Sequence, residues 1–168
     1  MRCFCVLDLG TCRWLRGLLT LDGGCLATLI RVLVVDDNEP WRQYVCSTLK
    51  TRPGIEVVGE AWDGLEAVRI AEVLKPDLIL LDIGLPHLSG IDAAHRLCQA
   101  VPDAKILFLT QNNDAELVQE ALSNGAQGYV LKTHAGSDLL PAIKAVLRGE
   151  NFVSSGIKGG DTGETENK

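Results

Sequence analysis

Three aspartates that follow apolar runs are the residues of this sequence best suited to chemistry. Asp82 follows the apolar run 78–81, and Asp36 and Asp37 follow a second run, 32–35. Three carboxylates that meet at one place repel one another unless a cation neutralises them or they take up protons. A hard divalent cation with oxygen ligands is therefore the expected occupant if the three acids converge.

The acids can converge only if the strands before them are neighbours. Continuous apolar runs bounded by turn residues are typical of strands that are covered on both faces of a parallel sheet. From residue 30 onward such runs alternate with segments whose apolar residues recur at helical spacing, and Ser137 is expected to cap the last of these helices. We expect strands at about 31–35, 55–61, 77–82, 104–109 and 128–131, and helices at about 39–50, 64–74, 89–100, 114–124 and 138–148.

This alternation predicts an α/β domain, a doubly wound five-stranded parallel sheet with helices on both faces. The expected strand order is the flavodoxin-like order 2-1-3-4-5, which makes the first and third strands neighbours. Asp36, Asp37 and Asp82 then meet at one edge of the sheet. Thr110 and Lys132, which follow the fourth and fifth strands, are expected at the same edge.

The length of 168 residues suits one domain with loose ends. Residues 1–29 lack clear periodicity, and we expect an extension that is disordered or loosely packed, or one that covers an apolar patch or mediates self-association. The domain is expected to span residues 30–150. Residues 151–168 are polar and rich in glycine, so we expect a flexible tail or the start of a linker.

Composition narrows the classes of partner. A net charge of −6 gives no electrostatic footprint for nucleic acid, so a protein partner is favoured, and no apolar run approaches the ~20 residues that cross a bilayer. The six cysteines include no C-x-x-C pair, so neither a zinc site nor a disulfide framework is indicated. Cys46 and Cys98 are expected in the core, and a reducing cytoplasm is the expected setting.

Four motifs give the sequence a specific resemblance to a known family. They are VVDD at 34–37, LDIGLPHLSG at 81–90, FLT at 108–110 and GYVLK at 128–132. Through them, residues 30–150 resemble a receiver domain of bacterial two-component response regulators, a CheY-like domain of the type found in LuxR/NarL-like regulators.

The resemblance implies a phosphoacceptor and a metal site. Asp82 is expected to accept a phosphoryl group from a phosphohistidine of a sensor histidine kinase. Asp37, Asp82 and the backbone carbonyl of Gly84 are expected to ligate Mg²⁺, with Asp36 acting through a bound water. Such transfer depends on positioning and on neutralising charge more than on covalent activation.

The resemblance also implies a switch. Lys132 is expected to neutralise one phosphoryl oxygen and Thr110 to donate a hydrogen bond to another. Thr110 and Tyr129 would then move together and alter the surface made by the fourth helix, the fifth strand and the fifth helix. A homodimer is expected to form through that surface.

Two alternatives remain at this point. Residues 147–154 are similar to the junction that leads into a helix-turn-helix DNA-binding domain, so the chain is either a stand-alone receiver or the receiver part of a transcriptional regulator. A phosphatase with Asp82 as nucleophile is the runner-up from another class, but Gly84 stands where such enzymes carry a second acid. We therefore expect a signalling domain and not an enzyme. Gln111 departs from the small residue common in receivers, which leaves the phosphate lifetime open.

Overall fold

The computed structural model describes residues 29–157, so the expectations for residues 1–28 and 158–168 lie outside the described residues. The described strands are β1 (Ile30–Val35), β2 (Ile55–Ala61), β3 (Leu78–Leu81), β4 (Lys105–Thr110), β5 (Gly128–Leu131) and β6 (Phe152–Val153). They form one parallel sheet in the order β2-β1-β3-β4-β5-β6. The predicted flavodoxin-like order is confirmed, and a sixth strand is added to it.

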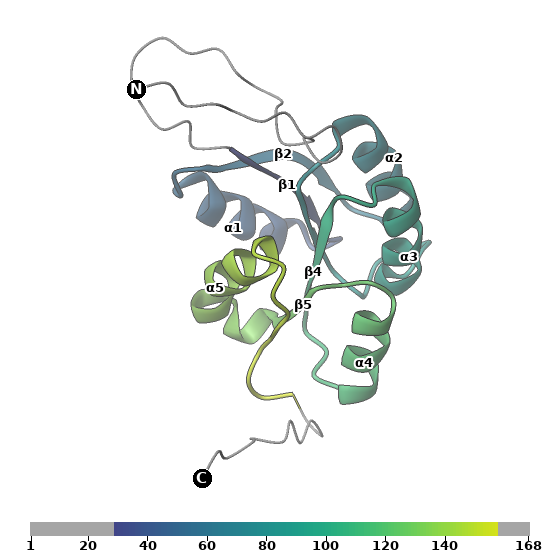
Figure 1. Ribbon diagram of the computed structural model, residues 1–168, viewed down its shortest axis with the longest axis vertical. Coiled ribbons are helices and arrows are strands. Elements are labelled where there is room, and N and C mark those ends of the chain that lie inside the picture. The colour runs from purple at the N-terminus through teal and green to yellow at the C-terminus, as the bar shows by residue number, and fades with distance from the viewer. Residues whose placement is uncertain (1–28, 158–168) are drawn as a thin grey trace, which may run out of the picture.

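Helices cover both faces of the sheet. They are α1 (Glu39–Lys50), α2 (Gly64–Leu74), α3 (Gly90–Ala100), α4 (Ala115–Ser123) and α5 (Ala135–Leu147), with the 3₁₀ turn η1 (Lys132–His134) before α5. In Figure 1, α2, α3 and α4 lie on one side of the sheet, while α1 and α5 lie on the other. None of the helices between residues 29 and 157 has the length and apolar character needed to span a bilayer.

The central strands are buried on both faces, which is why their sequences are continuous apolar runs. In β1, Leu33 and Val35 pack into the core beneath α2, α3 and α4, whereas Val32 and Val34 pack into the core beneath α1 and α5. Of the two cysteines within the described residues, Cys46 is buried in the second core and Cys98 packs against the first.

The start of α5 differs from the prediction. The helix begins at Ala135, directly after η1, and not beyond a cap at Ser137. The Ser137 hydroxyl lies 3.0 Å from the carbonyl oxygen of His134 and 2.7 Å from Asp138 Oδ1, so it does not cap the helix. A serine before an apolar stretch resembles an N-cap in sequence, but here the preceding turn already supplies the first helical residues.

The segment after α5 also differs from the prediction. Residues 152 and 153 lie in the expected tail, yet they form β6 and pair in parallel with Gly128 and Tyr129. Two residues are too few to show an alternating pattern, so the strand gave no recognisable sequence signal. The sheet therefore extends past the expected domain end at residue 150.

Candidate functional site

The acidic residues meet because β1 and β3 are neighbours in register. Val35 pairs with Leu81, and the backbone N–H of Asp82 donates to the carbonyl of Val35 at 3.0 Å. Asp36 and Asp82 therefore leave the sheet side by side at its carboxyl edge. One carboxylate oxygen from each of Asp36, Asp37 and Asp82 lies within 4.8 Å of the others.

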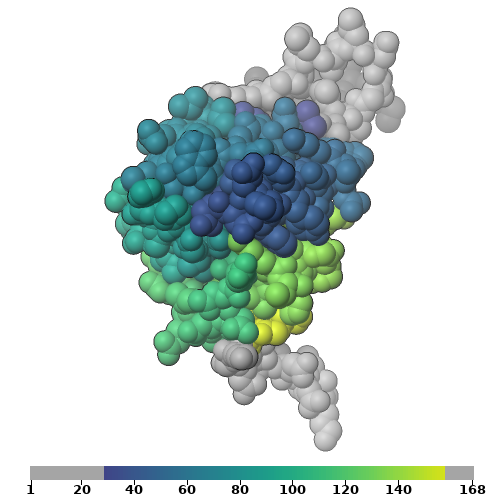
Figure 2. Space-filling view, turned by 180° about the vertical axis from the view of Figure 1, so that it is seen from behind, coloured from purple at the N-terminus to yellow at the C-terminus, as the bar shows by residue number. Residues whose placement is uncertain are grey.

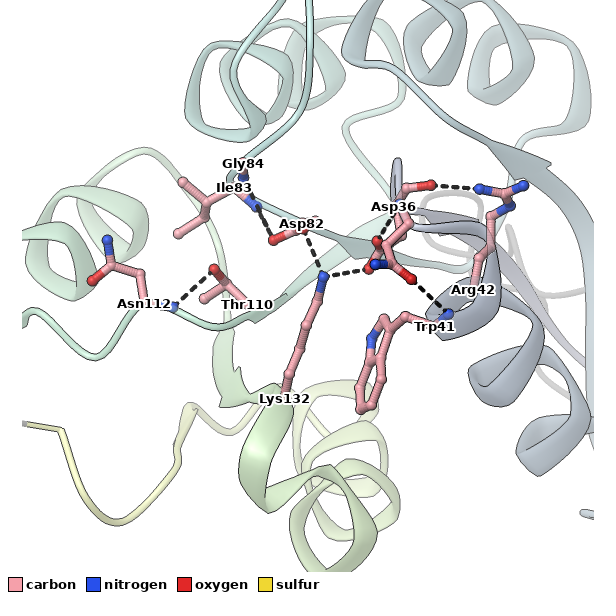
Figure 3. A network of polar contacts seen from close by, with 10 residues as sticks. Asp36, Trp41, Arg42, Asp82, Ile83, Gly84, Thr110, Asn112 and Lys132 are labelled. Carbon is pink, nitrogen blue, oxygen red and sulfur yellow. Dashed lines mark hydrogen bonds and ion pairs between the residues drawn. The ribbon is translucent and has the colours of Figure 1, made fainter.

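Lys132 crosses from the far side of the site to join two of these acids. Its ammonium nitrogen lies 2.7 Å from Asp36 Oδ2 and 2.7 Å from Asp82 Oδ2. Figure 3 shows the lysine reaching up between the two carboxylates. The three residues are 8%, 2% and 7% exposed, respectively, so the ion pairs lie where water screens them little.

Asp36 and Asp37 differ in how deeply they are buried. Asp36 is almost completely buried, and this burial raises the pKa of its carboxyl group above the ordinary value of 3.8. The hydrogen bond and the charge of Lys132 oppose that rise, while the charge of Asp82 adds to it. Asp37, by contrast, is exposed at the mouth of the site.

Backbone groups hold the two buried carboxylates in place. Asp82 Oδ1 accepts hydrogen bonds from the N–H groups of Ile83 at 2.7 Å and Gly84 at 3.5 Å. Asp36 Oδ1 accepts from the N–H of Asn38 at 3.0 Å, and the Asn38 side chain caps α1. The carboxylates are thus oriented before any ligand arrives, which is the preorganisation that favours charge stabilisation.

Trp41 lies beside the site, although its position in the sequence favoured packing in the core or partly at the surface. Its ring centre lies 5.8 Å from the Lys132 ammonium nitrogen, and Figure 3 shows the indole beside the lysine chain. An aromatic face at this distance attracts a cation. No motif spacing could indicate this contact, because it joins the first turn of α1 to the turn after β5.

Thr110 and Tyr129 are joined through Asn112. The Thr110 hydroxyl oxygen accepts from the N–H of Asn112 at 3.3 Å, and the Tyr129 hydroxyl donates to the Asn112 carbonyl at 2.8 Å. Tyr129 is fully buried with its ring near Phe108, at 6.3 Å between centroids. Burial, with the charges of Asp114 and Asp82, raises the pKa of Tyr129 to about 12, so the phenol remains a donor at neutral pH.

These groups open onto a surface cavity of about 540 Å³. Its walls carry carboxylates, amides, a hydroxyl and an ammonium group, contributed by Asp37, Asn38, Asp82, Ile83, Gly84, Thr110, Gln111, Asn112 and Lys132. The cavity brings every strand-end residue predicted for the site to one place except Asp36, which is buried behind it. Gln111 lies in the wall of the cavity, next to Thr110.

The donor set fits a hard divalent cation. Three carboxylates face one ammonium group, so two negative charges remain uncompensated among the residues that line the cluster. All the clustered donor atoms are oxygens, the ligands that Mg²⁺ and Ca²⁺ take in proteins. Because Asp37 is exposed and lines the cavity, a cation can reach the cluster from the cavity side.

Comparisons with known proteins agree with this geometry. Residues 32–144 match the family described as the response regulator receiver domain. The chain is 40% identical over 131 residues to the transcriptional regulatory protein LiaR of Bacillus subtilis, an alignment that covers 78% of this chain and 62% of LiaR. The chain thus spans less than two thirds of that relative.

Solved structures of response regulators also resemble this chain. A two-component response regulator of the LuxR family from Aurantimonas superposes with a TM-score of 0.73 at 35% identity, over 76% of this chain and 91% of that one. The response regulator domain of CheB from Thermotoga maritima superposes with a TM-score of 0.67 at 34% identity, over 71% and 97% of the two chains.

Proposed function

Since the chain belongs to the response-regulator receiver family of two-component systems, we propose that it accepts a phosphoryl group on Asp82 from a sensor histidine kinase. The observation that supports this most is the ion-paired cluster at the carboxyl edge of the sheet. There Asp82 lies 2.7 Å from Lys132 and in the wall of an open cavity. A nucleophile, a counter-charge and access for a donor therefore occur together.

In the proposed transfer, a carboxylate oxygen of Asp82 forms a bond to phosphorus while the bond from phosphorus to the donor imidazole nitrogen breaks. The leaving imidazole takes up a proton from solvent. Lys132 then exchanges its contact with Asp82 for a phosphoryl oxygen, so that its charge remains paired throughout. Before transfer the Thr110 hydroxyl oxygen accepts from the N–H of Asn112. It gives up that contact when it turns to donate its hydroxyl proton to another phosphoryl oxygen.

We propose Mg²⁺ as the resident cation, held by Asp37, Asp82 and the carbonyl of Gly84, with Asp36 acting through a water. The ion would supply positive charge against the phosphoryl oxygens. The chain itself holds Asp82 by the backbone donors of Ile83 and Gly84 in the wall of the open cavity.

The proposed switch acts through the link at Asn112. When the Thr110 hydroxyl turns toward a phosphoryl oxygen, it loses its hydrogen bond from the Asn112 N–H. The Tyr129 hydroxyl donates to the carbonyl of the same residue, so the change at Thr110 is passed to Tyr129. Tyr129 belongs to β5, and Asn112 lies just before α4. A change at Asp82 can therefore reach the surface formed by α4, β5 and α5.

The output is proposed to be control of transcription. LiaR is named a transcriptional regulatory protein, and this chain spans 62% of its length. A receiver that acts by protein contact and a receiver that is part of a longer DNA-binding regulator remain distinguishable. The genomic reading frame after residue 168 would either encode recognition helices or stop.

The decisive test is intact mass after incubation with Mg²⁺ and acetyl phosphate. We expect one phosphoryl adduct on the wild type and none on Asp82→Ala. The matched control is Asp77→Ala. It removes the aspartate that directly precedes the first residue of β3, at the end of the strand away from Asp82, and should still form the adduct. An adduct that persists on Asp82→Ala, or a wild type that forms none, would contradict the proposal.

A further inference from the structure

The segment after α5 is attached to the strand that precedes Lys132. β6 runs parallel to β5, and the backbone N–H of Ser154 donates to the carbonyl of Tyr129 at 2.9 Å. Ser154 is only 3% exposed, although it lies near the end of the described chain. Figure 2 shows this yellow segment against the green surface of the C-terminal half of the domain.

The hydroxyl group of Ser154 joins two elements. It accepts a hydrogen bond from the backbone N–H of Leu131 at 3.2 Å and donates to Asp138 Oδ2 at 2.6 Å. Alternate residues of a strand direct their backbone groups to the same side, so Leu131, like Tyr129, faces β6 and not β4. The hydroxyl thus takes the place of the next carbonyl in the ladder, where a buried N–H needs an acceptor.

These contacts lie on both sides of Lys132. Leu131 directly precedes it, and Asp138 lies in the first turn of α5, just after η1. Asp138 also has the Ser137 hydroxyl 2.7 Å from its other oxygen. The two ends of the turn that carries Lys132 are therefore tied together by a single hydroxyl group from outside the turn.

We propose that Ser154 is a positioning residue for Lys132. By joining the end of β5 to the start of α5, it fixes the backbone from which the lysine reaches both Asp36 and Asp82. This rests on the proposed role of Asp82 as phosphoacceptor. Ser154 lies beyond residues 32–144, which match the family, so the site of this chain depends on a segment outside the matched region.

The arrangement has a consequence for regulation. Any event that draws β6 away from β5 also removes the acceptor of Leu131 and frees the turn at Lys132. Whatever is attached to or bound by the segment after α5 would therefore influence phosphoryl transfer, and phosphorylation would in turn influence that segment.

The test measures the rate of phosphorylation by acetyl phosphate, with intact mass as the readout. We expect Ser154→Ala to lower the maximal rate several-fold, less than the roughly 100-fold loss that a misplacement of 1 Å can cause. The acetyl phosphate concentration at half-maximal rate should change less than the maximal rate, because Ser154 itself does not line the cavity. Ser154→Thr, which keeps the hydroxyl, should restore the rate.

Two further variants separate positioning from a general loss of structure. Ser155→Ala removes the neighbouring, exposed serine and should leave the rate unchanged. In a Lys132→Ala background, Ser154→Ala should cause no additional loss, because the residue that it positions is already gone. Should Ser154→Ala fail to fold, Asp138→Ala removes the partner of the hydroxyl and is expected to lower the rate in the same direction.

The outcomes distinguish this inference from the proposed function. A wild type without an adduct would contradict both. A phosphorylated wild type with an unchanged rate in Ser154→Ala would overturn only the positioning role. An equal loss from Ser154→Ala in the presence and absence of Lys132 would overturn it as well.

Discussion

One ammonium group is ion-paired with two buried carboxylates at the centre of the site. Lys132 is 2.7 Å from both Asp36 and Asp82, and removing one partner of a buried pair leaves a charge without compensation. We expect Lys132→Met to lower the free energy of unfolding by about 3–5 kcal/mol at neutral pH. Urea unfolding measures this, and saturating Mg²⁺ should reverse part of the loss. Lys144→Met, at an exposed position of α5, is the control, and an equal loss from both variants would contradict the prediction.

Gly84 leaves room above Asp82, the proposed phosphoacceptor. It lines the cavity, and a Cβ built on it would meet no atom of the described residues within 4 Å. We expect Gly84→Arg to lengthen the phosphorylated lifetime, because a long side chain can shield the phosphoryl group from water. A time course of phosphate release measures the lifetime. Gly84→Ala is the matched control and should behave as the wild type, and an unchanged lifetime in Gly84→Arg would contradict the idea.

At the scale of elements, the entry into α3 leaves no space beside Asp82. Gly90 begins α3, and a Cβ on it would overlap the carbonyl oxygen of Asp82 and lie 2.7 Å from the Cα of Ile83. We expect Gly90→Ala to destabilise the domain by about 1–3 kcal/mol and to reduce the fraction phosphorylated, because the backbone that carries Asp82 must shift. Urea unfolding and intact mass measure the two effects.

Gly136 provides the matched control for that substitution. It lies in α5, where a Cβ would meet no described atom within 4 Å. Gly136→Ala should stabilise the helix by about 0.5–1 kcal/mol, because alanine loses less conformational freedom on folding. If Gly90→Ala behaved like Gly136→Ala, the close approach of α3 to Asp82 would not be what requires a glycine.

The junction of β6 and α5 should respond to pH through Asp138. Hydrogen bonds from Ser154 and Ser137 lower the pKa of its carboxyl group below the ordinary value of 3.8. A lowered pKa in the folded state contributes stability above the unfolded value, and this contribution is lost as the pH falls through the folded value. We therefore expect the stability difference between wild type and Asp138→Ala to be larger at about pH 7 than at about pH 3.

Urea unfolding at the two pH values measures that difference. Ser155→Ala serves as the control, since its neutral side chain should give a difference that does not change with pH. A constant difference between wild type and Asp138→Ala would show that the carboxylate contributes only through packing.

At the scale of the whole molecule, the sequence was sufficient to predict five of the six described strands and the meeting of their carboxyl ends. The apolar runs that end at Val35 and Leu81 predict buried parallel strands, and the carboxyl ends of such strands share an edge. The structure places Asp36 and Asp82 together at that edge, as this reasoning requires.

Other features depend on side chains that meet only in the folded chain. The contact of Trp41 with Lys132 joins distant segments, and a flexible lysine can reach many partners, so no spacing identifies the one it takes. The Ser154 hydroxyl substitutes for a backbone carbonyl after a strand of two residues, which is too short to be recognised. Residue propensity and hydrophobic periodicity predict helices and strands. These contacts depend instead on where the ends of different helices and strands meet in the folded chain.

The surface predicted at α4, β5 and α5, where β6 covers the outer edge of β5, is where the whole molecule should respond to phosphorylation. Because a symmetric dimer uses the same patch of both subunits, one charge reversal places two altered charges in the interface. We expect acetyl phosphate and Mg²⁺ to double the mass of the wild type in light scattering after gel filtration, and Lys144→Glu, at an exposed position of α5, to prevent this. Arg96→Glu, an exposed reversal on α3, should leave the dimer intact. A fully phosphorylated protein that remains monomeric would contradict the homodimer, while the phosphoacceptor role of Asp82 would stand.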